Sequence, residues 1–177
     1  MTDRSTDRSI LERTRVGEPD ALAELYSKYA AAVHRVAFRL TRSVEDADDV
    51  LQDVFAGLPE ALRSFEGRGS LEGWLRMIAA RRSLMLMRKK RIRRETDLTA
   101  LSGVGEAGGS EPVVDRVDLE RALTHLPPSL RAVFVLHEVE GYSHEEIGEM
   151  LEIGRSGSAS KLHRARKALR DMLRGSR

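Results

Sequence analysis

Residues 44 to 55 read V-E-D-A-D-D-V-L-Q-D-V-F, a stretch in which apolar and acidic residues separate at the helical repeat. At 3.6 residues per turn, the apolar residues of this stretch and of its continuation share one inward arc: Val50, Leu51, Val54, Phe55, Leu58 and Leu62. The acidic residues occupy the outward arc: Glu45, Asp46, Asp49 and Asp53. The pattern predicts an amphipathic helix whose outer face repels phosphate and suits a basic protein surface. Taken alone, it is also typical of an ordinary solvated helix with acids near its N-terminus.

The composition is that of a folded chain with one or two small domains, since 41% of the 177 residues are hydrophobic and 33% are charged. No apolar run approaches the roughly 20 residues that span a bilayer, and the N-terminus lacks an apolar secretory segment. We therefore expect a cytoplasmic protein with no stable membrane insertion. The absence of cysteine excludes disulfides and thiolate metal sites.

The net charge of +2 hides a segregated distribution. Residues 81–94 hold eight basic residues and no acid, and residues 155–177 hold eight basic residues and one acid, Asp171. Charge separated in this way indicates oriented binding of a polyanion.

Helical spacing recurs along both halves of the chain. A first helix is expected from about Asp20 to Leu40, with Pro19 as its N-terminal starter, then the acidic helix, and a third helix from Leu71 after a loop over residues 65–70. After residue 114, helices are expected over residues 115–126, 129–139 and 143–151 and from about Arg155, and no strand pattern appears. The predicted fold is all-α, with two small helical domains joined by a flexible linker and a helix-turn-helix in the second. The expected boundaries are a flexible N-terminus over 1–17, a first domain over 18–94, a Gly- and Ser-rich linker over 95–114, and a second domain over 115–177.

The second domain carries the helix-turn-helix signal. Ser143 is placed as an N-cap with Glu146 as its capping-box partner, and a turn follows Leu151. The exposed N-terminal half of the next helix can reach a major groove through five side chains: Arg155, Ser158, Ala159, Lys161 and Arg164. The alternative is a helical hairpin with a solvated basic face.

Within the basic block of residues 81–94, four apolar residues run consecutively from Leu84 to Met87, so a helix cannot turn all of them toward one core. An apolar patch flanked by cations suits opened or kinked DNA. The alternatives are a solvated helix end and methionines that fill gaps in a core.

Enzyme signals are weak. The histidine-glutamate pairs do not form H-E-x-x-H, no phosphate-binding loop or G-x-S-x-G occurs, and the aspartates of residues 46–53 lack the glycine turn of a calcium loop. We expect no catalytic residues, no cofactor and no bound metal.

Blocks from both halves resemble bacterial extracytoplasmic-function sigma factors. In the first half they are D-A-L-A-E-L-Y (20–26), E-D-A-D-D-V-L-Q-D-V-F (45–55) and G-W-L-R-M-I-A (73–79). In the second half they are L-P-P-S-L-R-A-V-F-V-L (126–136), E-G-Y-S-H-E-E-I-G (140–148) and L-H-R-A-R-K-A-L-R (162–170). The order and spacing of these blocks are more specific than any one of them.

The resemblance implies a transcription initiation factor that binds core RNA polymerase and promoter DNA and opens the minus-ten element. It places polymerase binding on five residues: Asp46, Asp49, Gln52, Asp53 and Phe55. It places minus-ten recognition on the segment around residues 65–90, through Arg68, Trp74, Arg76, Arg81, Arg82, Arg88 and Lys89. It places minus-thirty-five recognition on Arg155, Ser156, Ser158, Ala159, Ser160, Lys161 and Arg164. Family members are commonly held by an anti-sigma factor, so such a partner is also implied.

Three residues depart from the family pattern. Arg81 stands where I-A-x-N has asparagine, Met85 where aspartate is common, and Ala159 where lysine is common. The base preferences of relatives at either element therefore do not transfer to this chain.

Two other functions fit parts of the sequence. A stand-alone helix-turn-helix regulator explains the second domain but leaves the acidic helix without a role. More distantly, clustered carboxylates with magnesium could serve a nucleic-acid-processing enzyme.

The length of the linker indicates that a scaffold such as polymerase must hold the two domains apart on DNA. About 20 linker residues span about 25 Å when relaxed and about 66 Å when stretched, whereas one DNA turn is already about 34 Å long. We therefore expect the free protein to bind promoter DNA weakly.

Overall fold

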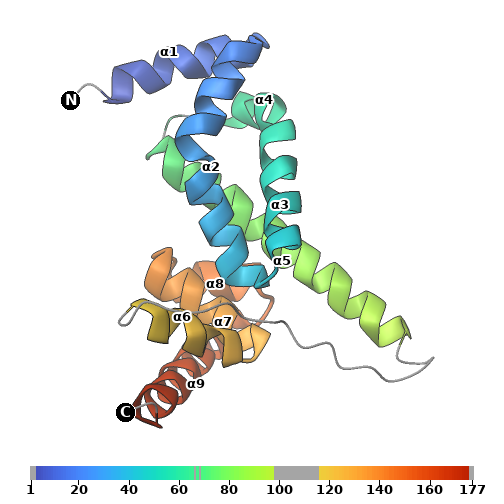
Figure 1. The fold of residues 1–177 in the computed structure, drawn as a ribbon, viewed down its shortest axis with the longest axis vertical. Coiled ribbons are helices and arrows are strands. Elements are labelled where there is room, and N and C mark those ends of the chain that lie inside the picture. The colour runs from blue at the N-terminus through green and yellow to red at the C-terminus, as the bar shows by residue number, and fades with distance from the viewer. Residues whose placement is uncertain (1–2, 66, 68, 98–115, 176–177) are drawn as a thin grey trace. The chain divides into compact units, whose positions relative to one another are not determined.

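The structure is a computed structural model that describes residues 3–65, 67, 69–97 and 116–175. Every regular element in these ranges is a helix and none is a strand, which confirms the all-α prediction (Figure 1). The chain divides into two compact units, residues 1–89 and 90–177. The linker predicted over residues 95–114 lies almost wholly outside the described residues.

Three long helices build the core of the first unit, as their apolar spacing predicts. α2 (Pro19–Thr41) has Pro19 in its first turn, and α3 (Val44–Ala56) packs along it (Figure 1). The short α4 (Leu58–Ala61) and the 3-10 turn η1 (Leu62–Ser64) lead to α5 (Leu71–Asp97). Burying a leucine side chain contributes about 1.5–3 kcal/mol. Fully buried leucines come from α2, α4, η1 and α5: Leu25, Leu40, Leu58, Leu62 and Leu75.

The N-terminus differs from the flexible segment expected over residues 1–17. Residues Asp3–Arg15 form a helix, α1, that packs on α2 and buries Ile10 and Leu11. The buried hydroxyl of Thr14 donates to the carbonyl of Ile10 at 2.8 Å. Three inward positions on a 13-residue helix suffice for docking, but they are too few to stand out from the polar residues around them.

α5 is longer than expected and runs past residue 94 to Asp97. Its side chains confirm that Leu84 to Met87 cannot all be buried: Met85 is 71% exposed, whereas Leu84, Leu86 and Met87 are half-buried. Basic residues 88 to 94 therefore continue a helix rather than starting a tail.

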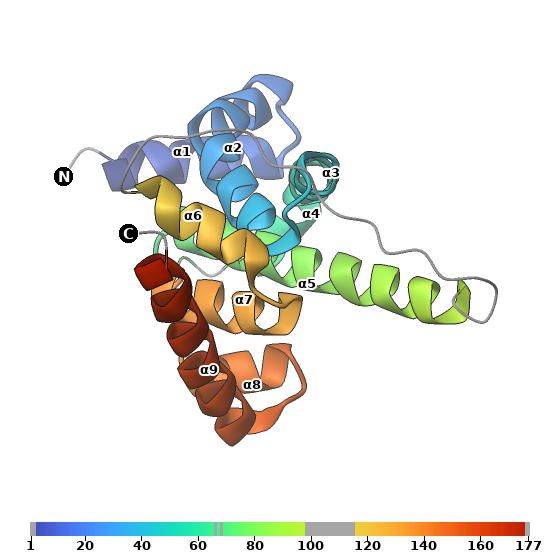
Figure 2. The same ribbon diagram turned by 60° about the horizontal axis from the view of Figure 1, so that its bottom comes forward.

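The second unit contains α6 (Arg116–His125), α7 (Pro128–Phe134), the π-helical segment η3 (Val135–Val139), α8 (His144–Met150) and α9 (Gly154–Gly175). α9 packs against α6, α7 and α8 (Figure 2). The core of the second unit contains residues of α6, α7 and α9 and one residue of the connection before α7: Ala122, Leu123, Leu126, Leu130, Ala165 and Leu169. The Pro127-Pro128 pair interrupts the helical structure between α6 and α7, as predicted. It also starts the next helix, because Pro128 occupies the first turn of α7.

Candidate functional site

α3 presents an acidic face, defined here as the exposed residues Glu45, Asp49, Gln52 and Asp53. The helix begins at Val44, where the predicted acidic stretch starts, and Ser43 is its N-cap: the Ser43 hydroxyl accepts a hydrogen bond from the backbone N–H of Asp46 at 3.2 Å. The Asp53 side chain is 69% exposed. Three of the five residues predicted to bind polymerase, Asp49, Gln52 and Asp53, therefore lie together on one accessible surface.

The other two predicted polymerase-binding residues are buried. Asp46 is 7% exposed and Phe55 is 5% exposed, with the Phe55 ring edge-on to Tyr26 at 4.9 Å between centroids. Both lie on the inner side of α3, and Phe55 packs against α2 through Tyr26. The sequence pattern identified the helix correctly but could not separate the residues that support it from those that face outward.

α5 carries six of the seven residues predicted for minus-ten recognition, and the structure sorts these six into two groups. Arg81, Arg88 and Lys89 are exposed and lie on the same helix as the exposed Met85. Trp74, Arg81, Met85 and Arg88 follow one another at seven, four and three residues, so they share one side of α5. Arg68 lies outside the described residues.

The remaining three residues of that prediction have partners within the unit. The Trp74 ring packs on the Phe65 ring at 4.9 Å between centroids, and Arg76 forms an ion pair with Glu72 at 3.6 Å. Arg82 lies 3.5 Å from the Asp53 carboxylate and so connects α5 to the acidic face of α3. Arg82 therefore has an intramolecular role that its place in a basic run did not reveal.

The helix-turn-helix in the second unit forms as the sequence predicts. Ser143 accepts a hydrogen bond from the Glu146 N–H at 3.3 Å, and Glu146 accepts one from the Ser143 N–H at 2.8 Å, completing the capping box. The turn is tight at Gly148, where an added Cβ would lie 2.5 Å from the carbonyl carbon of Gly154. Gly154 has φ of 66°, which glycine adopts without strain.

Six of the seven residues predicted to read the minus-thirty-five element are accessible at the start of α9. Arg155, Ser156, Ala159, Ser160 and Arg164 are exposed and Lys161 is half-buried. Arg155 also forms an ion pair with Glu145 of α8 at 3.1 Å. The first turns of α9 therefore present short polar side chains and cations together.

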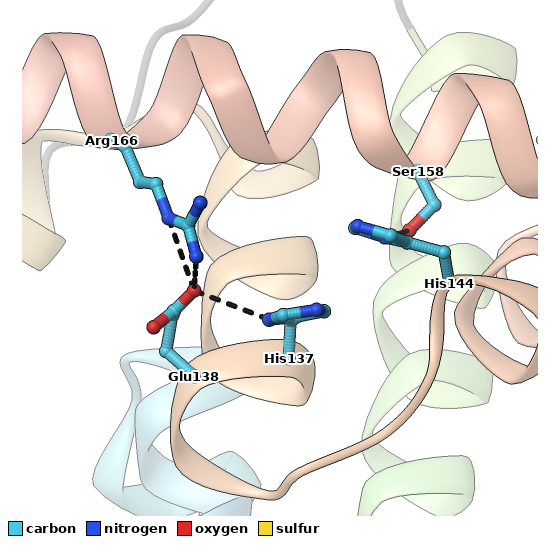
Figure 3. A network of polar contacts seen from close by, with 5 residues as sticks. All are labelled: His137, Glu138, His144, Ser158 and Arg166. Atoms are coloured by element: carbon cyan, nitrogen blue, oxygen red, sulfur yellow. Dashed lines mark hydrogen bonds and ion pairs between the residues drawn. The ribbon is translucent and has the colours of Figure 1, made fainter.

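Ser158 is the exception and corrects the prediction. Its side chain is fully buried, and its Oγ shares a hydrogen bond with Nδ1 of His144 at 3.0 Å (Figure 3). The hydroxyl therefore faces α8 and not the outer surface of α9. It lies on the inner side of the helix together with Leu162 and Ala165.

A polar network joins η3, α8 and α9 beside this hydrogen bond. Glu138 accepts hydrogen bonds from Arg166, one of them from Nε at 3.1 Å, and the His137 and His144 rings stack at 4.5 Å (Figure 3). Burial raises the pKa of Glu138, but the hydrogen bonds and charges of Arg166 and His137 outweigh it and hold that pKa below its usual value. Sequence reasoning missed this network, because Glu138 and Arg166 are 28 residues apart and no spacing rule links them.

Features of other protein classes are weak in the described part of the chain. No group of three histidine or acidic side chains there could hold a metal ion. A pocket between α2 and α5, lined by Arg35, Arg39 and Arg76 among others, has a volume of about 70 Å³. Small-molecule sites are usually about 300–1,000 Å³, so this pocket is too small for a typical substrate. Among the described residues, no helix has the length and apolarity needed to cross a membrane.

Comparison with known proteins assigns the two units. The Sigma-70 region 2 family model matches residues 25–93, and the Sigma-70, region 4 model matches residues 116–169. The chain is 32% identical over 184 residues to the ECF RNA polymerase sigma factor SigE of Mycolicibacterium smegmatis, covering 97% of this chain and 69% of the relative. It is also 32% identical to the RNA polymerase sigma factor CarQ of Myxococcus xanthus, covering 92% of this chain and 95% of the relative.

A solved structure shares the fold. The sigma factor RpoE of Bartonella quintana, crystallised in complex with the anti-sigma factor NepR, superposes with a TM-score of 0.60 at 24% identity, covering 88% of this chain and 98% of that one. The helices, the two matched regions and the relatives lead to one assignment: the chain belongs to the extracytoplasmic-function (ECF) family of RNA polymerase sigma factors.

Proposed function

We propose that this sigma factor divides transcription initiation among three surfaces: the acidic face of α3 for core RNA polymerase, one side of α5 for the minus-ten element, and the start of α9 for the minus-thirty-five element. The observation that supports this division is the separation of exposed charge. Carboxylates gather on α3, whereas exposed cations gather on α5 and α9. A surface that repels phosphate and two that attract it need different partners.

The polymerase surface consists of the exposed Asp49, Gln52 and Asp53, supported from below by Asp46 and Phe55. Carboxylates held on a rigid helix attract a basic protein surface, and they repel the phosphates of nucleic acid from the acidic face. The ion pair between Arg82 and Asp53 ties this surface to α5 at 3.5 Å. Polymerase docking and the position of the minus-ten helix are thereby linked through one contact.

The minus-ten surface consists of Trp74, Arg81, Met85 and Arg88 on one side of α5. A ring and a thioether offer apolar contact to unstacked bases, while the neighbouring guanidiniums attract phosphate. Strand opening then needs no catalytic group, because the free energy of binding flipped bases offsets a few kcal/mol per step of unstacking. Sigma factors are in general non-enzymatic transcription factors, and we extend that description to this chain.

The minus-thirty-five surface consists of the exposed side chains at the start of α9. Arg155 and Arg164 supply charge, and Ser156, Ala159 and Ser160 leave room for α9 to enter a major groove. Ala159 offers only a methyl group, which suits apolar contact with a thymine methyl rather than a hydrogen bond. We propose that base preference at this element rests on the arginines and serines around it.

A reconstituted transcription reaction tests the whole proposal. Core polymerase, genomic promoter fragments and the purified chain should yield run-off transcripts that are absent when either protein is omitted. A chain that binds duplex promoter DNA but never associates with core polymerase would instead be a stand-alone regulator. DNA cleavage that requires magnesium and is lost in Asp49→Ala would establish the enzymatic alternative.

We also propose that an anti-sigma factor regulates the chain, as NepR is bound to RpoE in the solved relative. Such a partner would have to hide at least one of the three surfaces. Competition between a candidate partner and core polymerase, measured with the purified proteins, tests this point. Simultaneous binding of both would contradict it.

A further inference from the structure

Arg15, the last residue of α1, reaches across the sequence to the segment that precedes α5. Its Nε donates to the carbonyl oxygen of Leu62 at 3.2 Å, and its Nη2 donates to the carbonyl oxygen of Phe65 at 2.9 Å. The two acceptors are 47 and 50 residues away in the chain. A planar guanidinium can hold two carbonyls at once, which a lysine ammonium does less well because it lacks a rigid fork.

The two carbonyls belong to the short 3-10 turn that precedes α5. Leu62 begins η1 and Phe65 is its C-cap, and the Leu62 carbonyl also accepts a hydrogen bond from the Phe65 N–H at 3.2 Å. Hydrogen bonds from a charged donor are stronger than neutral ones. Arg15 therefore fixes the backbone at the point where the chain leaves η1.

Phe65 connects the segment held by Arg15 to the minus-ten surface, because it contacts Trp74. Its side chain is 8% exposed, and its ring packs on the Trp74 ring at 4.9 Å between centroids. Ser70 fixes the other end of the connection, because its hydroxyl accepts from the Gly73 N–H at 3.0 Å and its carbonyl accepts from the Trp74 N–H at 3.1 Å. Trp74 is thus held by the helix cap on one side and by Phe65 on the other.

α1 is anchored independently of this contact. Ile10 and Leu11 are buried, and Arg13 donates to Glu18 at 2.7 Å and to Glu24 at 3.1 Å. Arg13 and Arg15 thus share a helix but contact different segments. The Sigma-70 region 2 match begins at residue 25, so neither arginine lies inside it.

We propose that Arg15 is a positioning residue for minus-ten recognition: by holding the carbonyls of Leu62 and Phe65, it sets the Phe65 ring against Trp74 and orients that tryptophan for capture of an unstacked base. The proposal rests on the proposed function of α5. It assigns α1 a role in promoter opening, through the backbone before α5 and without contact with DNA.

The first test needs only the free protein, because Trp74 is the single tryptophan of the chain. Arg15→Ala should shift its fluorescence emission to the red and increase its quenching by iodide, since the Phe65 ring is no longer held. The matched control is Arg13→Ala, which removes the contacts of α1 with Glu18 and Glu24 but leaves the Leu62 and Phe65 carbonyls bound. Arg15→Lys should fall between wild type and Arg15→Ala.

The second test uses holoenzyme assembled with core polymerase. Arg15→Ala should reduce open-complex formation on duplex promoters about tenfold, measured by permanganate reactivity of unpaired thymines, as expected for the loss of charged hydrogen bonds. Its affinity for core polymerase should stay at the wild-type value, and Arg13→Ala should open promoters normally. Circular dichroism of each variant establishes that the helices persist; if Arg15→Ala loses them, Arg15→Lys serves for both measurements.

The proposal is overturned if Trp74 fluorescence is the same in Arg15→Ala and wild type, or if Arg13→Ala and Arg15→Ala lose promoter opening equally. Failure of the proposed function and failure of the role of Arg15 give different results. If wild-type protein forms no open complexes, the proposed function fails. The fluorescence experiment still decides whether Arg15 positions Trp74.

Discussion

His144 and Ser158 share a hydrogen bond of 3.0 Å between Nδ1 and Oγ, across the interface of the two helices of the helix-turn-helix. His144 is the first residue of α8 and Ser158 lies in the second turn of α9, where it is fully buried. The bond therefore holds together the ends of the two helices that face each other. A serine that the sequence places among DNA-reading residues instead maintains the geometry of the motif.

Ser158→Ala should lower the stability of the second unit by about 1 kcal/mol, because it leaves the ring nitrogen of the half-buried His144 without this hydrogen bond. Urea denaturation followed by circular dichroism measures this loss. The exposed Ser160 provides the matched control on the same helix. Ser160→Ala should leave stability unchanged and alter promoter affinity. If Ser158→Ala instead alters promoter affinity and leaves stability unchanged, Ser158 contacts DNA and this assignment is wrong.

Gly148→Ala should be more damaging than its size suggests. The new Cβ would lie 2.5 Å from the Gly154 carbonyl carbon and 2.8 Å from the Arg155 nitrogen, both backbone atoms that cannot rotate away. We expect a loss of about 1–3 kcal/mol in the free energy of unfolding and weaker minus-thirty-five binding, since the start of α9 must shift.

Gly157→Ala is the comparison for that substitution. Its Cβ would meet the Ile153 Cβ at 3.2 Å, so a shift of only a few tenths of an ångström relieves the contact. Its denaturation midpoint should stay near that of wild type. A larger loss in Gly157→Ala than in Gly148→Ala would show that the close approach of backbones is not the limiting contact.

Asp49→Lys should weaken binding to core polymerase by at least about tenfold, because a carboxylate on the docking face becomes a cation facing a basic surface. The helical signal should remain, since Asp49 is exposed. Glu60→Lys, a reversal at an exposed site on α4, should bind polymerase normally. Fluorescence anisotropy with labelled protein measures both affinities, and equal values for the two variants would remove Asp49 from the interface.

Arg164→Ala separates two ways of holding DNA. If Arg164 reads a base edge, the loss should be about 1–3 kcal/mol and should depend on promoter sequence; if it holds phosphate, the salt slope of binding should fall by about one unit. Filter binding of holoenzyme at several salt concentrations distinguishes the cases. Arg170→Ala, an exposed position further along α9, should change neither.

Glu138 predicts an acid-sensitive contribution to stability. Its pKa is lowered in the folded state, so the contribution is complete above the usual glutamate value of about 4.3 and is lost as pH falls through the lowered pKa. The pair with Arg166 is partly exposed, so its worth is about 1 kcal/mol or less. Urea midpoints from pH 7 to pH 3 should converge for wild type and Glu138→Gln at the acid end, and a constant difference across this range would contradict the assignment.

Much of the candidate site was predictable because its signals are local. Ser43, Ser143 and Pro19 act within a few residues of the helices they start, and the Glu146 capping partner is three residues from Ser143. Charge segregation along the chain is also visible before folding. These features separated an acidic helix from two basic ones and predicted their different partners.

Burial within those helices was harder to predict. Asp46 and Asp49 have the same chemistry and lie on the same predicted stripe, yet one is buried and the other exposed. Ser158 and Ser160 differ in the same way. A stripe on a helical projection is broad, and the line between its covered and uncovered parts depends on which neighbouring helix packs there.

The amino-acid sequence alone determines the all-α class, the starts of the principal helices, the two-part organisation and the separation of acidic from basic surfaces. Each of these depends on spacing within one or two helical turns. Only the tertiary structure decides that Arg15 holds Leu62 and Phe65, that Arg82 meets Asp53, and that Arg166 meets Glu138. Those partners are between 28 and 50 residues apart. They meet because helices pack in one arrangement, and no periodicity of the sequence encodes which side chains that packing brings within hydrogen-bonding distance.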